Sequence, residues 1–349
     1  MAAKTKTKKA KGRAKTKAKS KSKTKSKTKA KAKRTTARRA TSKKTKTTAA
    51  RAKRAAAKRK PARKQVKKRK VAAGPVTVES GKREGLNGPD PKLMDGQSPI
   101  WNRLMDRYFR LELDGWEKIP DEPSLLIGIH SGGPLTMDAW TVVLGWWRHF
   151  GESRALHGTA HDVLMQAPLL GEYFRRMGAI TPTRENIQAA FDKGDDVILW
   201  PGGEVDAYRT WTNRDKAVLG GRKGFIRLAI RSGVPILPIA TVGGHDTLFV
   251  LSEGRGLARF LNLKERMRSD VAPITFSVPF GITLHLTPFQ HIPLPAKIRT
   301  RFLEPVYLEN DPRFADDEEY VQQVYDEIEG TIQDGMNELA KKRKFPVFA

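Results

Sequence analysis

The sequence contains no cysteine among its 349 residues. This absence excludes disulfide bonds, thiolate metal sites and a cysteine nucleophile. Long apolar runs are also missing, since no stretch reaches the roughly 18 residues needed to cross a bilayer. The N-terminus lacks the hydrophobic core of a signal peptide. These absences are compatible with a cytoplasmic protein, and they restrict any membrane contact to the membrane surface.

Acidic residues are missing from the first 70 positions, which hold 34 of the 67 Lys and Arg residues; the first carboxylate is Glu79. The rest of the chain has 33 bases against 37 acids, so the formal net charge of +30 comes from the N-terminal segment. Residues 1–72 alternate Lys with Thr, Ala and Ser. Such a segment buries too little apolar surface to offset the entropy lost on ordering. We therefore expect a disordered basic tail over residues 1–72.

The composition of this tail resembles the tails of linker histones and of some bacterial histone-like proteins. Two partners fit it: nucleic acid, bound through counterion release, and anionic lipid head groups, attracted by the basic side chains. A solubilising tail without a dedicated partner is the third reading. Residues 1–72 contain no aromatic side chain that would stack on bases, so base-specific recognition is not expected.

The remainder of the chain is predicted to be one α/β domain. Residues 73–97 are rich in Gly and Pro and predict a linker, which places the folded domain at residues 98–349. Short apolar runs at 124–129, 197–200 and 234–241 alternate with helical patterns. This alternation predicts a largely parallel central sheet flanked by helices. Ligand sites in such sheets gather at the carboxyl ends of the strands.

His130 occupies this kind of position. It follows the first apolar run, opens a loop that contains Gly-Gly-Pro, and precedes Asp138 at an expected helix start. A histidine with a nearby carboxylate is a candidate general base with its orienting partner, although a lone His beside an apolar run is more often a packed or surface residue. A second pair, His157 and Asp162, is more closely spaced, but no buried strand leads to His157.

Four segments together resemble the motifs of the glycerolipid acyltransferase superfamily, the group of 1-acylglycerol-3-phosphate acyltransferases. They are residues 130–138, 178–184, 200–209 and 234–244. The Pro-Gly-Gly at the start of the third motif, residues 200–209, is similar to the monoacylglycerol and diacylglycerol acyltransferase-like branch. Two departures stand out. Seven residues separate His130 from Asp138, where the family usually has four, and Val205 stands where an Arg often follows the glycines of the third motif.

The resemblance implies an acyl-CoA-dependent O-acyltransferase that moves a fatty acyl group to the hydroxyl of a glycerolipid or lysophospholipid. His130 would take the proton of the acceptor hydroxyl, and Asp138 would orient the imidazole. Arg184 would bind a phosphate, Arg209 would replace the missing Arg, and backbone N–H groups near two glycines would approach the acyl carbonyl. The substrate-binding residues expected on this basis are Arg184, Gly202, Gly203, Glu204 and Arg209.

The same resemblance implies no cofactor, because acyl-CoA is a co-substrate. His245 and Asp246 form a single pair without the further spaced ligands of a metal site, so no metal is expected. The implied partners are acyl-CoA, a lipid acceptor, and an anionic membrane surface or nucleic acid for the tail. The implied location is cytoplasmic, peripherally associated with the inner face of a membrane.

Two other classes of function remain open from the sequence. One is a nucleic-acid-binding, nucleoid-associated protein whose histone-like tail acts beside a catalytically inactive acyltransferase-like domain. The other is an α/β hydrolase that uses Ser131, which is disfavoured because the chain has no Gly-x-Ser-x-Gly turn.

Overall fold

The computed structural model describes residues 86–267, 269–285, 287, 290–343 and 347. The predicted tail, residues 1–72, and the predicted linker up to residue 85 lie outside the described residues.

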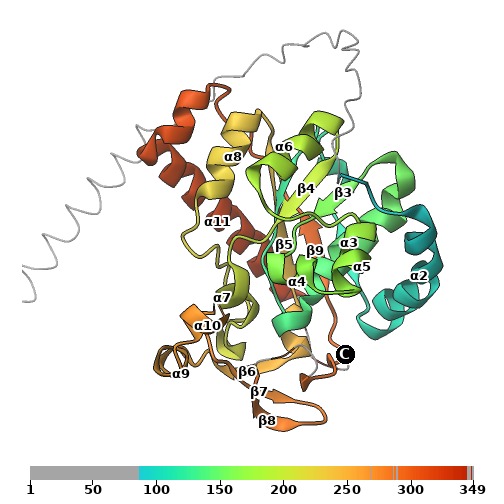
Figure 1. The fold of residues 1–349 in the computed structure, drawn as a ribbon, viewed down its shortest axis with the longest axis vertical. Helices are drawn as coiled ribbons and strands as arrows, with labels where there is room; N and C mark the ends of the chain where they lie inside the picture. Colours follow the sequence, from blue (N-terminus) through green and yellow to red (C-terminus); the bar gives the residue numbers. More distant parts are fainter. Residues whose placement is uncertain (1–85, 268, 286, 288–289, 344–346, 348–349) are drawn as a thin grey trace, which may run out of the picture. The chain divides into compact units, whose positions relative to one another are not determined.

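A six-stranded sheet forms the centre of the described part, in the order β1-β9-β5-β2-β4-β3 (Figure 1). Its strands are β1 (Glu112–Asp114), β2 (Leu125–Ile127), β3 (Leu156–Gly158), β4 (Asp196–Leu199), β5 (Ile236–Val242) and β9 (Arg299–Phe302). Strands β5, β2, β4 and β3 are mutually parallel, whereas β9 runs antiparallel to β5 and carries β1 parallel to itself. The predicted fold class, α/β with a largely parallel sheet flanked by helices, is confirmed.

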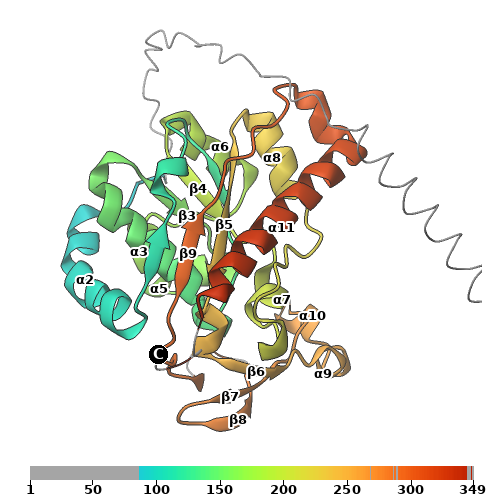
Figure 2. The same cartoon turned by 180° about the vertical axis from the view of Figure 1, so that it is seen from behind.

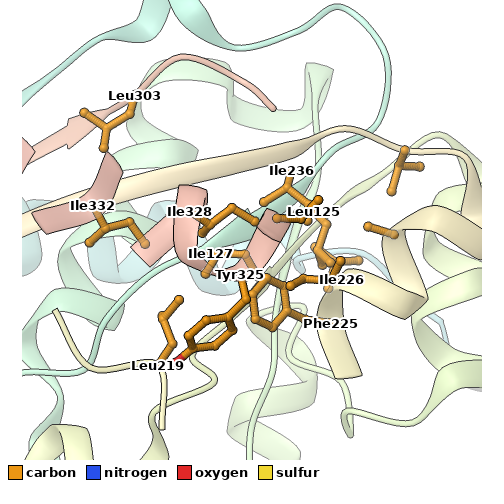
Figure 3. Packing of buried hydrophobic residues seen from close by; sticks show 14 of the residues in the cluster. Leu125, Ile127, Leu219, Phe225, Ile226, Ile236, Leu303, Tyr325, Ile328 and Ile332 are labelled. Atoms are coloured by element: carbon orange, nitrogen blue, oxygen red, sulfur yellow. The ribbon is translucent and has the colours of Figure 1, made fainter. Parts of the chain in front are cut away.

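One face of the sheet is covered by three helices: α6 (Arg184–Lys193), α8 (Gly224–Ser232) and α11 (Glu318–Lys341). Helix α11 begins after Asp317, whose carboxylate accepts hydrogen bonds from the N–H groups of Glu319 and Tyr320 and so satisfies two free helix donors. Figures 2 and 3 show α11 crossing the strands and its buried side chains packing on them. The packed residues include Tyr325, Ile328 and Ile332 of α11 with Leu125, Ile127 and Ile236 of the sheet.

The opposite face is covered by α3 (Met137–Phe150). Its Val142 and Trp146 pack with Leu126 and Phe302 of the sheet. Because alternate residues of β2 face the two helical layers, all three of its residues are buried, which explains the continuous apolar run in the sequence. Helices α2 (Pro91–Arg103) and α5 (Leu170–Arg176) pack outside α3.

Helix α2 begins seven residues before the expected start of the domain. Asp90 caps it by accepting hydrogen bonds from the N–H groups of Lys92 and Leu93, and Pro91 stands at the first helical position, where the absent N–H has no cost. Residues 91–97, where the sequence analysis expects a linker, are therefore helical. A π-helical turn, η1 (Leu104–Tyr108), continues α2.

A small antiparallel sheet follows β5 along the chain. It consists of β6 (Phe249–Ser252), β7 (Ile274–Ser277) and β8 (Gly281–Leu284), with α9 (Arg255–Phe260) and α10 (Leu263–Met267) between β6 and β7. In both views it lies beyond the carboxyl ends of the parallel strands (Figures 1 and 2). Two short helices, α4 (Asp162–Gln166) and α7 (Gly203–Ala207), complete the elements that matter below. None of the described helices combines the length and the apolarity required to cross a membrane.

Candidate active site

Three loops meet at the carboxyl edge of the parallel strands. They follow β2, β4 and β5, which are adjacent in the sheet and run in the same direction. The loop after β2 carries His130 and Ser131, the loop after β4 is the third motif, and the loop after β5 contains Gly244. A Cβ atom at Gly244 would lie 1.9 Å from the Ser131 Oγ, so the first and last loops are in direct contact. These loops form the candidate active site.

His130 and Asp138 are in contact within this site. The Nδ1 atom of His130 lies 3.3 Å from the Asp138 Oδ2 atom, and the Asp138 side chain is buried while that of His130 is partly exposed. The turn between them, η3 (Gly133–Leu135), begins at the second of two consecutive glycines, Gly132 and Gly133, whose φ angles are +83° and +69°. This left-handed backbone, which glycine adopts without strain, accommodates the seven intervening residues. The unusual spacing therefore does not separate the pair.

Ser131 holds the same carboxylate. Its backbone N–H donates to the Asp138 Oδ1 atom at 2.6 Å and its hydroxyl lies 3.1 Å from that oxygen. Asp138 thus accepts from Ser131 with one oxygen and faces the imidazole with the other. Because the Ser131 hydroxyl is buried and bonded to Asp138, the arrangement argues against Ser131 as a nucleophile.

Trp200 stacks on the imidazole of His130. The two ring centroids are 5.0 Å apart and the planes are inclined by only 7°. A Cβ atom at Gly128 would lie 2.7 Å from the Trp200 Nε1 atom, so glycine at this position makes room for the indole. Trp200 thus covers one face of the imidazole with its indole ring. The sequence analysis did not identify this residue.

Asp206 and Arg209 clamp the backbone of His130 from both sides. The Asp206 carboxylate accepts from the His130 backbone N–H with one oxygen and from the Arg209 guanidinium with the other. The Arg209 Nη2 atom is 3.5 Å from the His130 carbonyl oxygen. Burial raises the pKa of Asp206 to about 7, against the opposing effects of Arg209 and His130. The sequence analysis expects Arg209 to bind substrate; in this structure Arg209 is only 2% exposed and its guanidinium contacts Asp206 and the His130 backbone.

The two glycines of the third motif have structural reasons to be glycine. A Cβ atom at Gly202 would lie 2.2 Å from the Val218 carbonyl oxygen and 2.4 Å from the Asp206 Cβ atom. Gly203 has φ +57°, and its N–H donates to the Trp200 carbonyl oxygen at 3.2 Å. The Gly203 N–H is therefore hydrogen-bonded within its own loop in this structure, and the approach of N–H groups near the two glycines to an acyl carbonyl stays a prediction.

Glu204 lies next to these glycines and is half-buried. Its Oε2 atom is 3.8 Å from the Arg222 Nη2 atom, and the same guanidinium donates to the Pro201 carbonyl oxygen at 2.8 Å. Arg222 thus braces the loop from outside, and Glu204 contributes to that contact.

Substituting the two glycines with alanine will have unequal effects. Gly202→Ala places its methyl group against the Val218 backbone, which cannot yield without moving the loop, and we expect a loss of about 3 kcal/mol in the free energy of unfolding, the upper end for overpacking. Gly203→Ala meets the flexible end of Arg222, 2.6 Å from its Nη1 atom, and we expect about 1–2 kcal/mol, the cost of a left-handed alanine. Urea unfolding of both variants measures the difference, and equal losses would contradict this account.

The structure does not bring Arg184 to His130. Arg184 is the first residue of α6, exposed, and lines a shallow pocket of about 280 Å³ together with Leu199 and Arg231. Leu199 packs with the layer of α6, α8 and α11, whereas the next residue, Trp200, stacks on His130 from the other side of the sheet. The pocket of Arg184 therefore opens on the opposite face from the imidazole.

An apolar pocket of about 410 Å³ lies beside the His130 loop. Leu135 and Met137, which precede Asp138 in the sequence, form part of its wall and so place the pocket next to the loop. Most of its other lining comes from α2, η1 and α3. The lining residues are Trp101, Leu104, Tyr108, Phe109, Leu135, Met137, Trp140, Ile292 and Pro293. The helical spacing of apolar residues 100–109 predicts packing there, but only the fold shows that part of this face lines a pocket.

The other two His and Asp pairs noted in the sequence, His157 with Asp162 and His245 with Asp246, include residues that are held by buried contacts. His157 is fully buried, and its ring nitrogens lie 2.7 Å from the Gly178 carbonyl oxygen and 3.0 Å from the Asp195 carboxylate. Asp246 lies next to Arg214 and Arg343, at 3.2 and 3.4 Å. In the described part of the chain, no three or more His, Asp and Glu side chains are grouped to hold a metal ion.

Comparison with known proteins identifies several relatives of this chain. An uncharacterised protein of Mycobacterium tuberculosis (strain H37Rv) is 26% identical over 250 residues, covering 70% of this chain and 66% of that protein. The chicken DGAT1/2-independent enzyme synthesizing storage lipids is 28% identical over 52% of this chain and 50% of its own length. Phytyl ester synthase 1 of Arabidopsis thaliana is 25% identical over 66% of this chain and 34% of its own. The chain thus spans from one-third to about two-thirds of the length of these relatives.

Among solved structures, the 1-acyl-sn-glycerophosphate acyltransferase PlsC of Thermotoga maritima matches 72% of this chain and 81% of its own, with 19% identity and a TM-score of 0.42. The sequence profile of the diacylglycerol acyltransferase family matches residues 96–344. That range includes the whole candidate active site, and the resemblance to glycerolipid acyltransferases is confirmed. The chain belongs to the diacylglycerol acyltransferase family.

Proposed function

We propose that this protein is an acyl-CoA-dependent O-acyltransferase that esterifies the hydroxyl of a lipid alcohol. The observation that carries the proposal is the contact between the His130 Nδ1 atom and the buried Asp138 carboxylate, 3.3 Å apart, next to an apolar pocket. Membership of the family makes acyl transfer the reaction to be expected of this pair, and the chemistry of the pair supports it.

In this mechanism His130 acts as the general base. With Nδ1–H directed at Asp138, the Nε2 atom is free to accept the proton of the acceptor hydroxyl as its oxygen attacks the thioester carbonyl. Asp138 holds the tautomer and stabilises the imidazolium. The C–S bond then breaks, the imidazolium returns the proton to the leaving thiolate, and an ester and free CoA result. No covalent acyl-enzyme is required.

The apolar pocket supports a fatty acyl chain as the group transferred. Its walls are aliphatic and aromatic side chains, and its volume of about 410 Å³ is within the range of small-molecule sites. Leu135 and Met137 place its wall within one turn of Asp138. A chain bound there would leave its thioester close to His130, which is the positioning that acyl transfer needs.

The charges around His130 favour an uncharged acceptor. The two described arginines expected to recognise a phosphate do not reach the imidazole as free groups: Arg209 is buried against Asp206, and Arg184 lies on the opposite face of the sheet. Two relatives are named for storage lipids and phytyl esters. We infer that the acceptor is a neutral lipid alcohol, such as an acylglycerol, rather than a lysophospholipid.

Incubation of the purified full chain with labelled acyl donors tests the proposal. The donors are acyl-CoA of short and long chain and acyl carrier protein loaded with the same acyl groups; the acceptors are monoacylglycerol, diacylglycerol, a long-chain alcohol and lysophosphatidic acid. We expect transfer of long acyl chains from acyl-CoA to the neutral alcohols, read by thin-layer chromatography. Absence of transfer from either donor to every acceptor would refute the enzyme proposal, and preference for lysophosphatidic acid would refute the neutral acceptor.

The alternative of a nucleic-acid-binding protein with an inactive domain finds no support in the family match or in the site. The His130–Asp138 pair is assembled, and the residues that hold it are in place. The tail on which that alternative depends lies outside the described residues, so binding of the tail to nucleic acid or to an anionic membrane stays a prediction, as do the cytoplasmic location and the peripheral membrane association.

A further inference from the structure

The small sheet β6–β7–β8 has its apolar and polar faces reversed. Phe276 of β7 and Ile282 of β8 are directly opposite each other in the register, so both side chains point to the same face, and both are exposed, at 44% and 69%. Antiparallel sheets normally bury their apolar face on the core and present polar residues to water. Here the apolar face points outward.

The other face of this sheet is polar and points toward the body of the domain. The Thr275 hydroxyl lies 3.0 Å from the His285 Nδ1 atom, and the Ser277 hydroxyl donates to the Gln290 carbonyl oxygen at 2.8 Å. His285 in turn packs near Tyr208, with ring centroids 6.0 Å apart. The sheet is therefore attached to the domain by its polar side. Along β7, polar side chains that face the domain alternate regularly with apolar side chains that face outward.

The exposed apolar residues form a continuous patch, which we call the apolar sheet face. It includes residues of β7, β8 and the turn between these two strands. Its members are Phe276, Val278, Phe280 and Ile282, each between 44% and 69% exposed. Exposed apolar residues scattered singly are normal on proteins, but a contiguous group marks an interaction site.

The far end of the same face is covered by α9 and α10. Leu284 pairs with Ile274 in the register, two residues along from the Phe276–Ile282 pair, and therefore points to the same side. It packs in a cluster with Ala258 and Leu263 of the two helices. Phe260, at the end of α9, is 85% exposed and follows Arg259, whose Nε donates to the Arg255 carbonyl oxygen at 3.4 Å. An exposed aromatic ring beside a basic residue is typical of a membrane interface.

The apolar sheet face is connected to the apolar pocket. Ile292 is 59% exposed and lines that pocket, and its N–H donates to the Val278 carbonyl oxygen at 3.0 Å. The neighbouring Pro293 also lines the pocket and accepts a hydrogen bond from the Tyr108 hydroxyl at 2.7 Å. A lipid leaving a bilayer in contact with this face would therefore meet apolar side chains along the way into the pocket.

We propose that the apolar sheet face docks the protein on the surface of a lipid bilayer and directs the mouth of the apolar pocket toward the lipids. The proposal rests on the proposed function for its choice of partner, since the substrates are lipids. The choice of this face as the docking surface rests on the reversed faces of the sheet and on its connection to the pocket. A second copy of this chain is the competing occupant, and the experiment distinguishes the two.

Sedimentation with phosphatidylcholine vesicles, without any acyl donor, tests the docking. Zwitterionic vesicles are used because the basic tail would bind anionic ones regardless of this face. We expect the full chain to co-sediment and the double variant Phe280→Ser/Ile282→Ser to lose about 10-fold in partitioning, since two large apolar side chains no longer leave water. The matched control is Tyr307→Ser: Tyr307 is 66% exposed and follows Val306, which pairs with Ile236 at the opposite end of β5. Its partitioning should equal that of the unmodified chain.

A conservative variant keeps the test decisive if the double variant unfolds. In Phe280→Trp the added indole should be quenched by brominated lipids beyond the quenching seen for the unmodified chain, and no added quenching would overturn the proposal. Sedimentation equilibrium provides the second check: a dimer that dissociates in Phe280→Ser/Ile282→Ser, with vesicle binding unchanged, would assign the face to a second copy. Docking by a protein that transfers no acyl group would leave this proposal standing and refute only the proposed function.

Discussion

Replacement of His130 by alanine is expected to lower kcat/KM for acyl transfer by about 10² to 10⁴, the range for loss of a general base, and to leave the melting temperature nearly unchanged. The imidazole is partly exposed, and Asp138 keeps its two contacts to Ser131 when the ring is removed. The fall should therefore appear in the chemical step and not in folding. Steady-state kinetics and thermal unfolding on the same preparation measure both quantities.

The matched control is His157→Ala. His157 is fully buried between the Gly178 carbonyl oxygen and Asp195, so its loss leaves buried groups without partners at about 1–3 kcal/mol. We expect the opposite pattern: a lower melting temperature, with activity retained per folded molecule. Full activity in His130→Ala would show that His130 is not the general base. Loss of activity in a well-folded His157→Ala would favour His157 instead.

The buried pair behind His130 should respond asymmetrically to substitution. Asp206→Asn leaves the Arg209 cation without a countercharge, and an amide has one acceptor oxygen where the His130 N–H and the guanidinium each require one. At pH 8, where the Asp206 carboxyl is ionised, we expect a loss of about 3–5 kcal/mol in the free energy of unfolding, as for other broken buried ion pairs. Activity should also fall, because the backbone that places the imidazole is no longer held.

Arg209→Met should cost less, because Asp206 can take a proton whereas an arginine cannot give one up. Burial already raises the pKa of Asp206 to about 7 with Arg209 present, and removal of the cation raises it further. The folded variant then holds a proton that the unfolded chain, with a carboxyl pKa of about 3.9, releases. Its stability must therefore fall, relative to the unmodified chain, as the pH rises above 7, by up to about 1.4 kcal/mol per pH unit.

Urea unfolding of both variants at pH 6 and pH 8 tests this asymmetry. The two variants are compared at pH 8, where the Asp206 carboxyl of the unmodified chain is ionised; there Asp206→Asn should lose more stability than Arg209→Met. The loss for Arg209→Met should be small at pH 6 and larger at pH 8. If Arg209→Met were the less stable variant at pH 8, or if its loss did not change with pH, Asp206 would not be a carboxyl that takes up a proton when Arg209 is removed.

Local patterns in the sequence were sufficient to predict the contact between His130 and Asp138 and the fold class. Alternation of short apolar runs with helical periods indicates parallel strands, because strands buried on both faces lack the period of two. His130 and Asp138 are close in the chain, at the end of one such run, so their contact depends on a single turn. Even there, the two left-handed glycines that close the spacing are visible only as residue types in the sequence, not as a conformation.

Contacts between distant segments were decided by the tertiary structure. Asp206 contacts the His130 backbone across 76 positions of the sequence. The third motif by itself therefore does not distinguish a residue that binds substrate from one that holds the His130 backbone. For this reason the sequence analysis expected Arg209 to bind substrate. Arg184 has the residue type of a phosphate ligand, but its position in α6 places it on the other face of the sheet. The antiparallel pairing of β9 with β5 likewise depends on tertiary structure, because β9 comes late in the chain and pairs with a strand that is distant in the sequence.

The sequence by itself determined that this chain has a basic N-terminal segment, one α/β domain, and a histidine and aspartate placed to meet. Only the tertiary structure decided what surrounds them: the stacked indole, the buried clamp, the apolar pocket that joins residues 101–140 to residues 292–293, and the outward apolar face of a small sheet. The physical reason is that periodicity and spacing report on neighbours along the chain, whereas burial depends on which distant side chains cover a given surface.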